Sequence, residues 1–267
     1  LSGATASNLN GGKLTIAAGT TILQANPWDV MDGVKLGTTS TITNASANTY
    51  INYLFRRAPG FYDTVCYTGT GVNTTVSHNL GAVPELMLVK RRNTTANWIV
   101  YQGFYPSSPI PAAGYLKLNL TDAVAYDSTI WNGTAPTSSV FSVGTNTGTN
   151  ASGGTYVAHL FATVPGVSKV GYYGGNTGVA IQINCGFTSG ARFVLIKRMS
   201  ATGDWYLWDT ARGIVSGNDP YFLLNSTAAE VTGTDYIDTY SAGFEISSSA
   251  PLALNQTSVF YLFWAIA

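Results

Sequence analysis

The chain repeats itself at a long spacing. Residues 44–55 (NASANTYINYLF) return as residues 150–161 (NASGGTYVAHLF), 106 positions later. The dipeptide Pro59-Gly60 returns in the same register as Pro165-Gly166, and the last seven residues resemble residues 156–162. A spacing of this size corresponds to a whole domain and not to one turn of a solenoid. The sequence therefore predicts a row of similar modules.

Further matches fill the space between these segments. Residues 86–91 correspond to 193–198, residues 98–101 to 205–208, and residues 115–119 to 221–225. The matches predict one module at 56–162 and a second at 163–267. Residues 1–55 end with the same closing segment but are half as long, so we expect a partial repeat, the C-terminal half of a unit, that must pair with another unit or subunit. Because the chain does not begin with Met, we expect it to derive from a longer precursor.

Strand signals dominate each module. Short runs of β-branched and aromatic residues alternate with polar residues and are bounded by Gly, Asn, Asp and Pro, as in residues 74–78 and 193–197. Residues 205–208 follow a Thr-Gly-Asp turn, so they should form a hairpin with 193–197. Each module offers about seven or eight strands, which predicts an all-β fold of tandem antiparallel β-sandwich repeats, jelly-roll-like, of about 106 residues. The closing segments 156–162 and 261–267 are apolar on both faces and should be central strands.

The low charge of the chain restricts its function. Charged residues make up 10% of the sequence and the formal net charge is zero, whereas about 25% is typical of soluble domains. We therefore expect no nucleic-acid partner, since such proteins carry a basic surface. No apolar run reaches the roughly 18 residues of a membrane helix, so we expect no membrane insertion. The surface should instead consist of Ser, Thr, Asn, Gly and Tyr, as on paratopes and sugar-binding faces.

The two cysteines, Cys66 and Cys185, do not occupy equivalent positions of the two modules. A disulfide between them would tie one module to the next. We expect instead two buried, reduced thiols, because a free cysteine behaves as a small apolar residue.

Few residues are suited to catalysis. His159 occupies a position taken by Tyr53 and Trp264 in the other copies, which predicts a large, half-buried packing site. No Cys/His pair has metal-ligand spacing, and no phosphate loop or nucleophile elbow is present. We therefore predict no catalytic residue, no metal site, no cofactor and no enzymatic activity. Asp235 and Asp238 leave two interpretations open, a turn or a calcium site.

The aromatic residues offer candidates for ligand binding. Trp98 and Trp205 occupy equivalent positions, where core packing is expected and a sugar-stacking platform is the alternative. Other aromatic residues lie in less regular surroundings near Gly or Pro, and we expect them to form an exposed recognition surface. They are Tyr101, Tyr105, Trp131, Tyr172 and Tyr173.

Five segments of the chain share a pattern with a known family. The pattern is an apolar strand ending in Lys-Arg, then Gly-Asp-Trp-Tyr-Leu-Trp-Asp-Thr-Ala-Arg-Gly, Tyr-Phe-Leu-Leu-Asn-Ser, Gly-Phe-x-Ile and Gly-Gly-Thr-Tyr-Val-Ala-His-Leu-Phe-Ala. These segments are residues 193–198, 203–213, 221–226, 243–246 and 153–162. On them the chain resembles an uncharacterised repeat domain of tail fibres and other virion structural proteins of tailed phages. The resemblance covers nearly all of the second module and most of the first, which lacks evident counterparts of Asp209 and Arg212.

The resemblance implies a bacteriophage virion structural protein, exposed on the particle surface. It favours a tail fibre or tail-tip adhesin that contributes to host attachment, or a capsid decoration protein. The implied partners are other virion proteins, copies of the same chain in a homo-oligomer such as a trimer, and a host cell-surface glycan or protein. The family supplies no catalytic residues.

Two alternatives stay open at this point. The first is a free-standing, lectin-like carbohydrate-binding module, which the Tyr- and Asn-rich surface would suit. The second is a polysaccharide depolymerase, which would need two facing carboxylates, one of them with a raised pKa. The acidic residues are few and are not paired between the modules, so this alternative ranks last.

Overall fold

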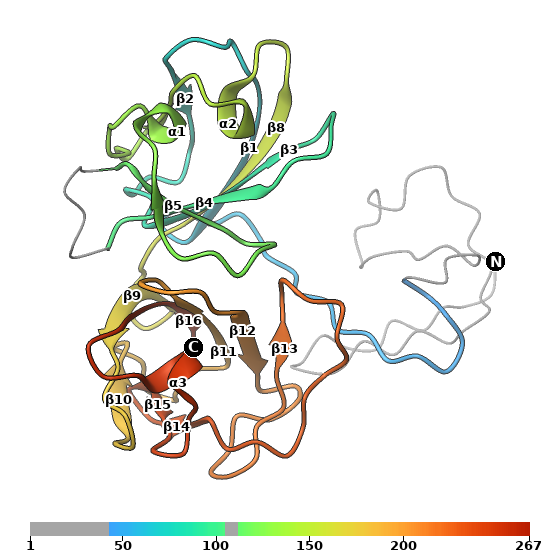
Figure 1. The fold of residues 1–267 in the computed structure, drawn as a ribbon, viewed down its shortest axis with the longest axis vertical. Coiled ribbons are helices and arrows are strands. Elements are labelled where there is room, and N and C mark those ends of the chain that lie inside the picture. The colour runs from blue at the N-terminus through green and yellow to red at the C-terminus, as the bar shows by residue number, and fades with distance from the viewer. Residues whose placement is uncertain (1–42, 105–111) are drawn as a thin grey trace. The chain divides into compact units, whose positions relative to one another are not determined.

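The computed structural model describes residues 43–104 and 112–267 (Figure 1). The chain divides into two compact units, residues 1–55 and residues 56–267. In the first unit, the described residues 43–55 form no helix or strand. The Tyr50 hydroxyl there accepts a hydrogen bond of 2.8 Å from the Ala45 amide. The rest of the expected partial repeat at 1–55 lies outside the described residues.

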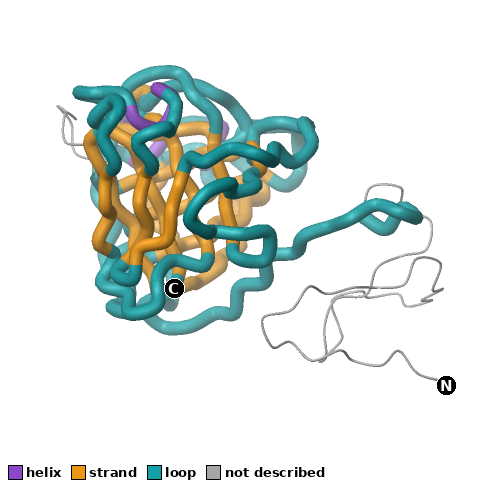
Figure 2. Tube along the Cα trace, turned by 90° about the horizontal axis from the view of Figure 1, so that it is seen from below, coloured by secondary structure: helices purple, strands orange, loops and turns teal. Residues whose placement is uncertain are grey.

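The second unit consists almost entirely of strands, and we refer to residues 56–162 as its first half and residues 163–267 as its second half. The described elements of the first half are β1 (Tyr62–Thr68), β2 (Thr74–Ser77), β3 (Leu86–Arg91), β4 (Trp98–Gln102), β5 (Gly114–Lys117), β6 (Ala125–Tyr126), α1 (Ser128–Trp131), β7 (Val140–Val143), α2 (Thr147–Asn150) and β8 (Thr155–Phe161). Those of the second half are β9 (Ser168–Gly174), β10 (Ile181–Asn184), β11 (Phe193–Arg198), β12 (Trp205–Asp209), β13 (Phe222–Leu223), β14 (Ile237–Tyr240), β15 (Gly243–Ile246), α3 (Leu252–Asn255) and β16 (Phe260–Ile266). The helices are single turns, and the strands lie side by side (Figure 2).

Each half pairs a large sheet with a small one. In the first half the large sheet has the order β1-β8-β3-β4-β5-β6 and the small sheet is β2-β7. In the second half the large sheet is β13-β12-β11-β16-β9 and the small sheet is β10-β15-β14. The strand pairs within these sheets are antiparallel. The predicted hairpin is confirmed as β11–β12.

A separate apolar core lies between the two sheets of each half. In the first half Val76 and Phe141 from the small sheet pack with Val89 and Leu160 from the large sheet. The second core is built in the same way from residues of the second half alone. The prediction of an all-β sandwich is therefore confirmed.

The closing strands lie in the interior of their sheets, as their apolar sequences predict. β8 pairs with β1 and with β3, and β16 pairs with β9 and with β11. In β8 the side chains of Tyr156, Ala158 and Leu160 are buried in the core, while Val157 and His159 lie half-buried on the opposite face. An interior strand carries apolar residues on both faces where other parts of the protein cover both faces of its sheet.

Several contacts occur at corresponding positions of the two halves. The Tyr156 hydroxyl donates to the Thr147 carbonyl and accepts from the Ala151 amide, each at 2.8 Å. The Tyr261 hydroxyl makes the same two bonds, to the Leu252 carbonyl and from the Gln256 amide. The 106-residue duplication stays a prediction, and so does the domain boundary at 162/163; these shared contacts support the duplication.

Candidate functional site

A groove opens at one edge of the second sandwich, where the edge strands β9 and β10 of its two sheets face each other. Its volume is about 360 Å³, which lies at the lower end of the range for ligand pockets. The lining comes from β9, β10, one residue of β16 and one residue that follows β4 in the first half. The lining residues are Phe104, Lys169, Val170, Gly171, Tyr172, Tyr173, Ile181, Gln182, Ile183, Asn184 and Phe263.

The base of the groove is rigid and apolar. Tyr173 and Phe263 belong to the core of the second half, and the Tyr173 hydroxyl donates a 2.8 Å hydrogen bond to the Leu254 carbonyl. Gly171 lies opposite Phe263 in the register of β9 and β16. A Cβ atom at this glycine would lie 2.8 Å from Cζ of Phe263, closer than carbon atoms approach each other. The glycine therefore allows the ring to lie flat against β9 beneath the groove.

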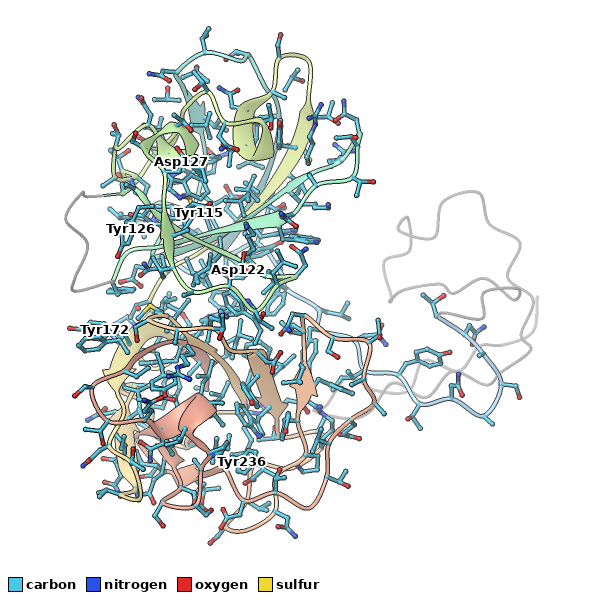
Figure 3. All side chains as sticks on the ribbon, in the orientation of Figure 1. Tyr115, Asp122, Tyr126, Asp127, Tyr172 and Tyr236 are labelled. Carbon is cyan, nitrogen blue, oxygen red and sulfur yellow. The ribbon has the colours of Figure 1, made fainter. Side chains whose placement is uncertain are left out.

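The rim of the groove is aromatic and polar. Tyr172 is 43% exposed and projects from β9 at the outer edge of the unit (Figure 3). The Tyr172 ring meets Phe260 edge to face at 5.8 Å between centroids. Lys169 is half-buried, and Gln182 and Asn184 are exposed. The rim thus combines an ammonium, two amides and a phenol around an apolar base.

Two of the polar side chains are held in place by their neighbours. The Gln182 amide donates to Oε2 of Glu245 at 2.9 Å, across the pair β10–β15. The Asn184 Oδ1 atom accepts from the Gly186 amide at 2.8 Å. Each side chain still has hydrogen-bonding capacity left for a ligand, because an amide carries two donors and an acceptor with two lone pairs.

The five predicted ligand-binding residues do not form one surface. Tyr172 and Tyr173 both line the groove, but Tyr173 is only 6% exposed. Tyr101 and Trp131 are buried in the first core and meet edge to face at 5.6 Å. The expectation of exposure is therefore wrong for Tyr101, Trp131 and Tyr173, and Tyr105 lies outside the described residues.

The reason for this error is the direction of each side chain. Tyr101 lies on the inner face of β4, and its burial raises the pKa of its hydroxyl to about 12. Trp131 ends α1, a single turn that lies against β7. That a residue lies near Gly or Pro in the sequence does not determine whether its ring points toward the core or toward solvent. The residues that the sequence missed, Lys169, Gln182 and Asn184, also lie on strands, and the alternation of Ile181 and Ile183 with polar residues was the available signal.

The remaining candidate residues have structural surroundings. His159 is half-buried, as predicted for a packing site, and its ring stacks near Trp98 and Tyr62. Its Nδ1 lies 2.7 Å from the Tyr62 hydroxyl, and burial lowers the pKa of the imidazole. Trp205 is fully buried but Trp98 only half so.

The acidic residues of the second half include Asp235 and Asp238, for which the sequence left a turn or a calcium site open. No group of three or more His, Cys, Asp or Glu residues suited to a metal ion occurs among residues 43–104 and 112–267. Asp219 is buried, and burial together with the charges of Asp238 and Asp235 raises its pKa to about 7. Its Oδ1 accepts from the Val215 amide at 2.7 Å. This arrangement makes Asp219 a buried carboxyl that binds a proton near neutral pH.

Both cysteines are free thiols. Cys185 is buried, and its burial raises the pKa of the thiol to about 12. Cys66 is exposed on β1, which corrects the expectation that both are buried. The odd-numbered neighbours Val65 and Tyr67 take the inner face of β1, so the thiol between them points outward.

Within the described residues, no helix has the length and apolar character to cross a bilayer. The search among curated proteins gives no match to this chain. A family model does match, and it extends across both halves of the second unit, from residue 58 to residue 267. The chain therefore belongs to the family of a domain of unknown function, DUF7483.

Proposed function

We propose that this protein is a bacteriophage virion component, a tail fibre or tail-tip adhesin, that binds a glycan of the host surface in the groove between β9 and β10. The observation that carries the proposal is the exposed Tyr172 ring at a groove that also presents Lys169, Gln182 and Asn184. Sugars offer an apolar ring face for an aromatic side chain and hydroxyl groups for amides. Rigid aromatic residues beside adaptable polar ones are typical of recognition surfaces.

The groove suits a ligand that binds from solvent and is not chemically changed. Its base is prearranged by Gly171 and Phe263, so binding requires little reorganisation, which favours affinity. Lys169 is the one basic side chain among the described residues that line the groove. An acidic sugar such as a uronic or sialic acid would add an ion pair with this lysine.

The assignment to a virion has separate support. It comes from the resemblance to phage tail-fibre repeat domains, from the low charge and from the modular sequence. The alternative is a free-standing carbohydrate-binding module with the same groove. The two differ in where the protein is found: on the particle, or secreted alone.

Binding to an array of bacterial surface glycans tests the groove. The wild-type chain should bind a subset of glycans, and Tyr172→Ala and Gln182→Ala should each weaken that binding at least about tenfold, as the loss of a central aromatic or polar contact does. Tyr126→Ala is the matched control, because Tyr126 is 41% exposed but lies outside the groove lining. Equal effects of Tyr172→Ala and Tyr126→Ala, or no glycan binding at all, would contradict the proposed groove.

Antibody labelling tests the location independently. Gold-conjugated antibodies against the chain should decorate the tail of the phage that encodes it in electron micrographs. Decoration of the capsid would assign it to a decoration protein instead. Unlabelled particles, together with glycan binding by the isolated chain, would favour the free-standing module.

A further inference from the structure

The two halves of the second unit contact each other through two different surfaces. The second half contributes the outer face of its large sheet, on the side away from its core. We call this the receiving face, and its residues are Leu195, Lys197, Trp205, Leu262 and Trp264. All five are at most 4% exposed, although none belongs to either sandwich core. The first half contributes residues 117–124, which begin at the last residue of β5 and which we call the inserting segment.

Hydrogen bonds and one ring contact define this junction. The Thr121 carbonyl accepts from Nζ of Lys197 and from the Gly203 amide, each at 2.9 Å. The Lys117 carbonyl accepts from Nε1 of Trp205 at 3.0 Å. Asp122 lies on the same segment, which Figure 3 shows between the two halves. Phe161 and Trp264 also meet, with ring centroids 4.1 Å apart.

The buried side chain of Lys197 indicates that the contact between the two halves is specific. Desolvation lowers the pKa of its amine to about 8, against the opposing charges of Asp204 and Asp122. A buried ammonium is costly unless carbonyl oxygens surround it. Thr121 and Gly203 supply those carbonyls, one from each half. The lysine is therefore satisfied only when the inserting segment is in place.

The first half carries a surface equivalent to the receiving face. In the strand register, Lys90 pairs with Trp98 as Lys197 pairs with Trp205. The other residues of this surface are identified from the pairing of β3 with β8, which has the same register as the pairing of β11 with β16. We call this the counterpart face, and its residues are Leu88, Lys90, Trp98, Val157 and His159. All five are only half-buried, whereas the residues of the receiving face are fully buried. Lys90 donates to the Ala96 carbonyl as Lys197 donates to Gly203, but the described residues provide no counterpart of Thr121 for it.

The second half, in turn, carries an unused equivalent of the inserting segment. Tyr206 pairs with Leu223 where Ile99 pairs with Lys117, so residues 223–230 correspond to the inserting segment, and we call them the terminal segment. Leu224 is 41% exposed there, and residues 226–230 are exposed as well. Among the described residues, no hydrogen bond joins the terminal segment to the counterpart face within one chain.

We propose that the counterpart face of one chain binds the terminal segment of a second copy of the same chain, which repeats the junction between the halves from molecule to molecule. The existing junction identifies the occupant, because it shows which segment fits such a face. In the proposed contact, Nζ of Lys90 donates to the Thr227 carbonyl and Nε1 of Trp98 to the Leu223 carbonyl. A contact between two different surfaces of identical chains is heterologous, so it builds a ring or a filament and not a closed symmetric pair. The proposal does not depend on glycan binding.

Sedimentation velocity of the full chain tests the proposal. The mass of the wild type should rise with concentration up to about 1 mM, where even a millimolar dissociation constant gives substantial association. Trp98→Glu replaces the large indole ring of the counterpart face with a charge, and Leu224→Asp places a charge on the terminal segment. Each should raise the dissociation constant at least about 30-fold, as expected for a central interface residue. Val72→Asp, at a residue that is 61% exposed on the loop before β2, is the control and should associate like the wild type.

Mixing the two variants separates this proposal from other modes of association. A Trp98→Glu chain keeps an intact terminal segment, and a Leu224→Asp chain keeps an intact counterpart face. An equimolar mixture should therefore form heterodimers and nothing larger, and their formation also shows that both variants are folded. A wild type that stays monomeric at every concentration overturns the proposal. So does association that both variants retain, or a mixture that stays monomeric although both variants have native near-ultraviolet circular dichroism.

Discussion

Tyr156 and Tyr261 make matched pairs of hydrogen bonds, and their removal gives a quantitative test of how the modules are held together. Tyr156→Phe and Tyr261→Phe keep the ring, which stacks on Tyr67 and Tyr173 respectively, and delete only the hydroxyl. Each substitution removes one bond to a carbonyl and one from an amide, at 2.8–2.9 Å. The effect of each on the free energy of unfolding therefore isolates the two bonds.

The expected magnitude follows from the surroundings of these bonds. A net contribution of about 1 kcal/mol per hydrogen bond gives a loss of roughly 2 kcal/mol for each variant. The partner residues Thr147 and Leu252 are exposed, so water replaces part of what is lost and the full penalty of an unsatisfied buried group does not apply. For a unit of this size, the loss corresponds to a melting temperature lower by about 4–8 °C.

Urea unfolding followed by tryptophan fluorescence, together with calorimetry, measures the effect. Tyr172→Phe is the control, because the exposed hydroxyl of Tyr172 should contribute less than about 0.5 kcal/mol. The two core variants should agree with each other within about 1 kcal/mol. A loss below about 0.5 kcal/mol for both would refute the assignment of the hydroxyls as stabilising, and a large difference between them would refute the equivalence of the two positions.

Three further outcomes follow from the second half. Gly171→Ala should destabilise the fold by about 1–3 kcal/mol and weaken glycan binding, because its Cβ would meet the Phe263 ring at 2.8 Å; unchanged urea midpoints would contradict this. Since the folded pKa of Asp219 is about 7 and its unfolded pKa about 3.9, the folded state holds the extra proton between these values. Stability should therefore fall as pH rises from about 4 to 7, by up to about 1.4 kcal/mol per pH unit, and Asp219→Asn should remove this dependence in urea titrations. A thiol reagent should modify Cys66 alone in the native chain and Cys185 only in denaturant; two fast-reacting native thiols would refute the burial of Cys185.

The sequence predicted the strands better than the site because strand position depends on local pattern. The closing segments are apolar at nearly every position, and both lie inside their sheets with a neighbouring strand on each side. The outer face of β16 is buried, whereas that of β8 is only half-buried. The β11–β12 hairpin also followed from its turn residues and alternation. These signals are contained within about ten residues of chain.

The groove depends on contacts that no local pattern contains. Its two walls, β9 and β10, belong to different sheets, and Phe104 reaches it from the first half. Tyr172 and Tyr173 are adjacent in sequence, yet one is exposed and the other buried, because neighbouring side chains of a strand point to opposite faces. The sequence identified the aromatic pair, but the strand register decided which ring can meet a ligand.

The interior position of the closing strand determines when each sandwich can be completed during synthesis. In the first half, β1 and β3 are joined only through β8, whose pairing runs from Tyr62 with Phe161 to Thr68 with Thr155. In the second half, β9 and β11 are likewise joined through β16, which follows both of them in the sequence. During synthesis, each large sheet therefore has two strand edges without a hydrogen-bonded neighbour until its closing strand leaves the ribosome. Chaperones or neighbouring nascent chains can reach the chain at these edges.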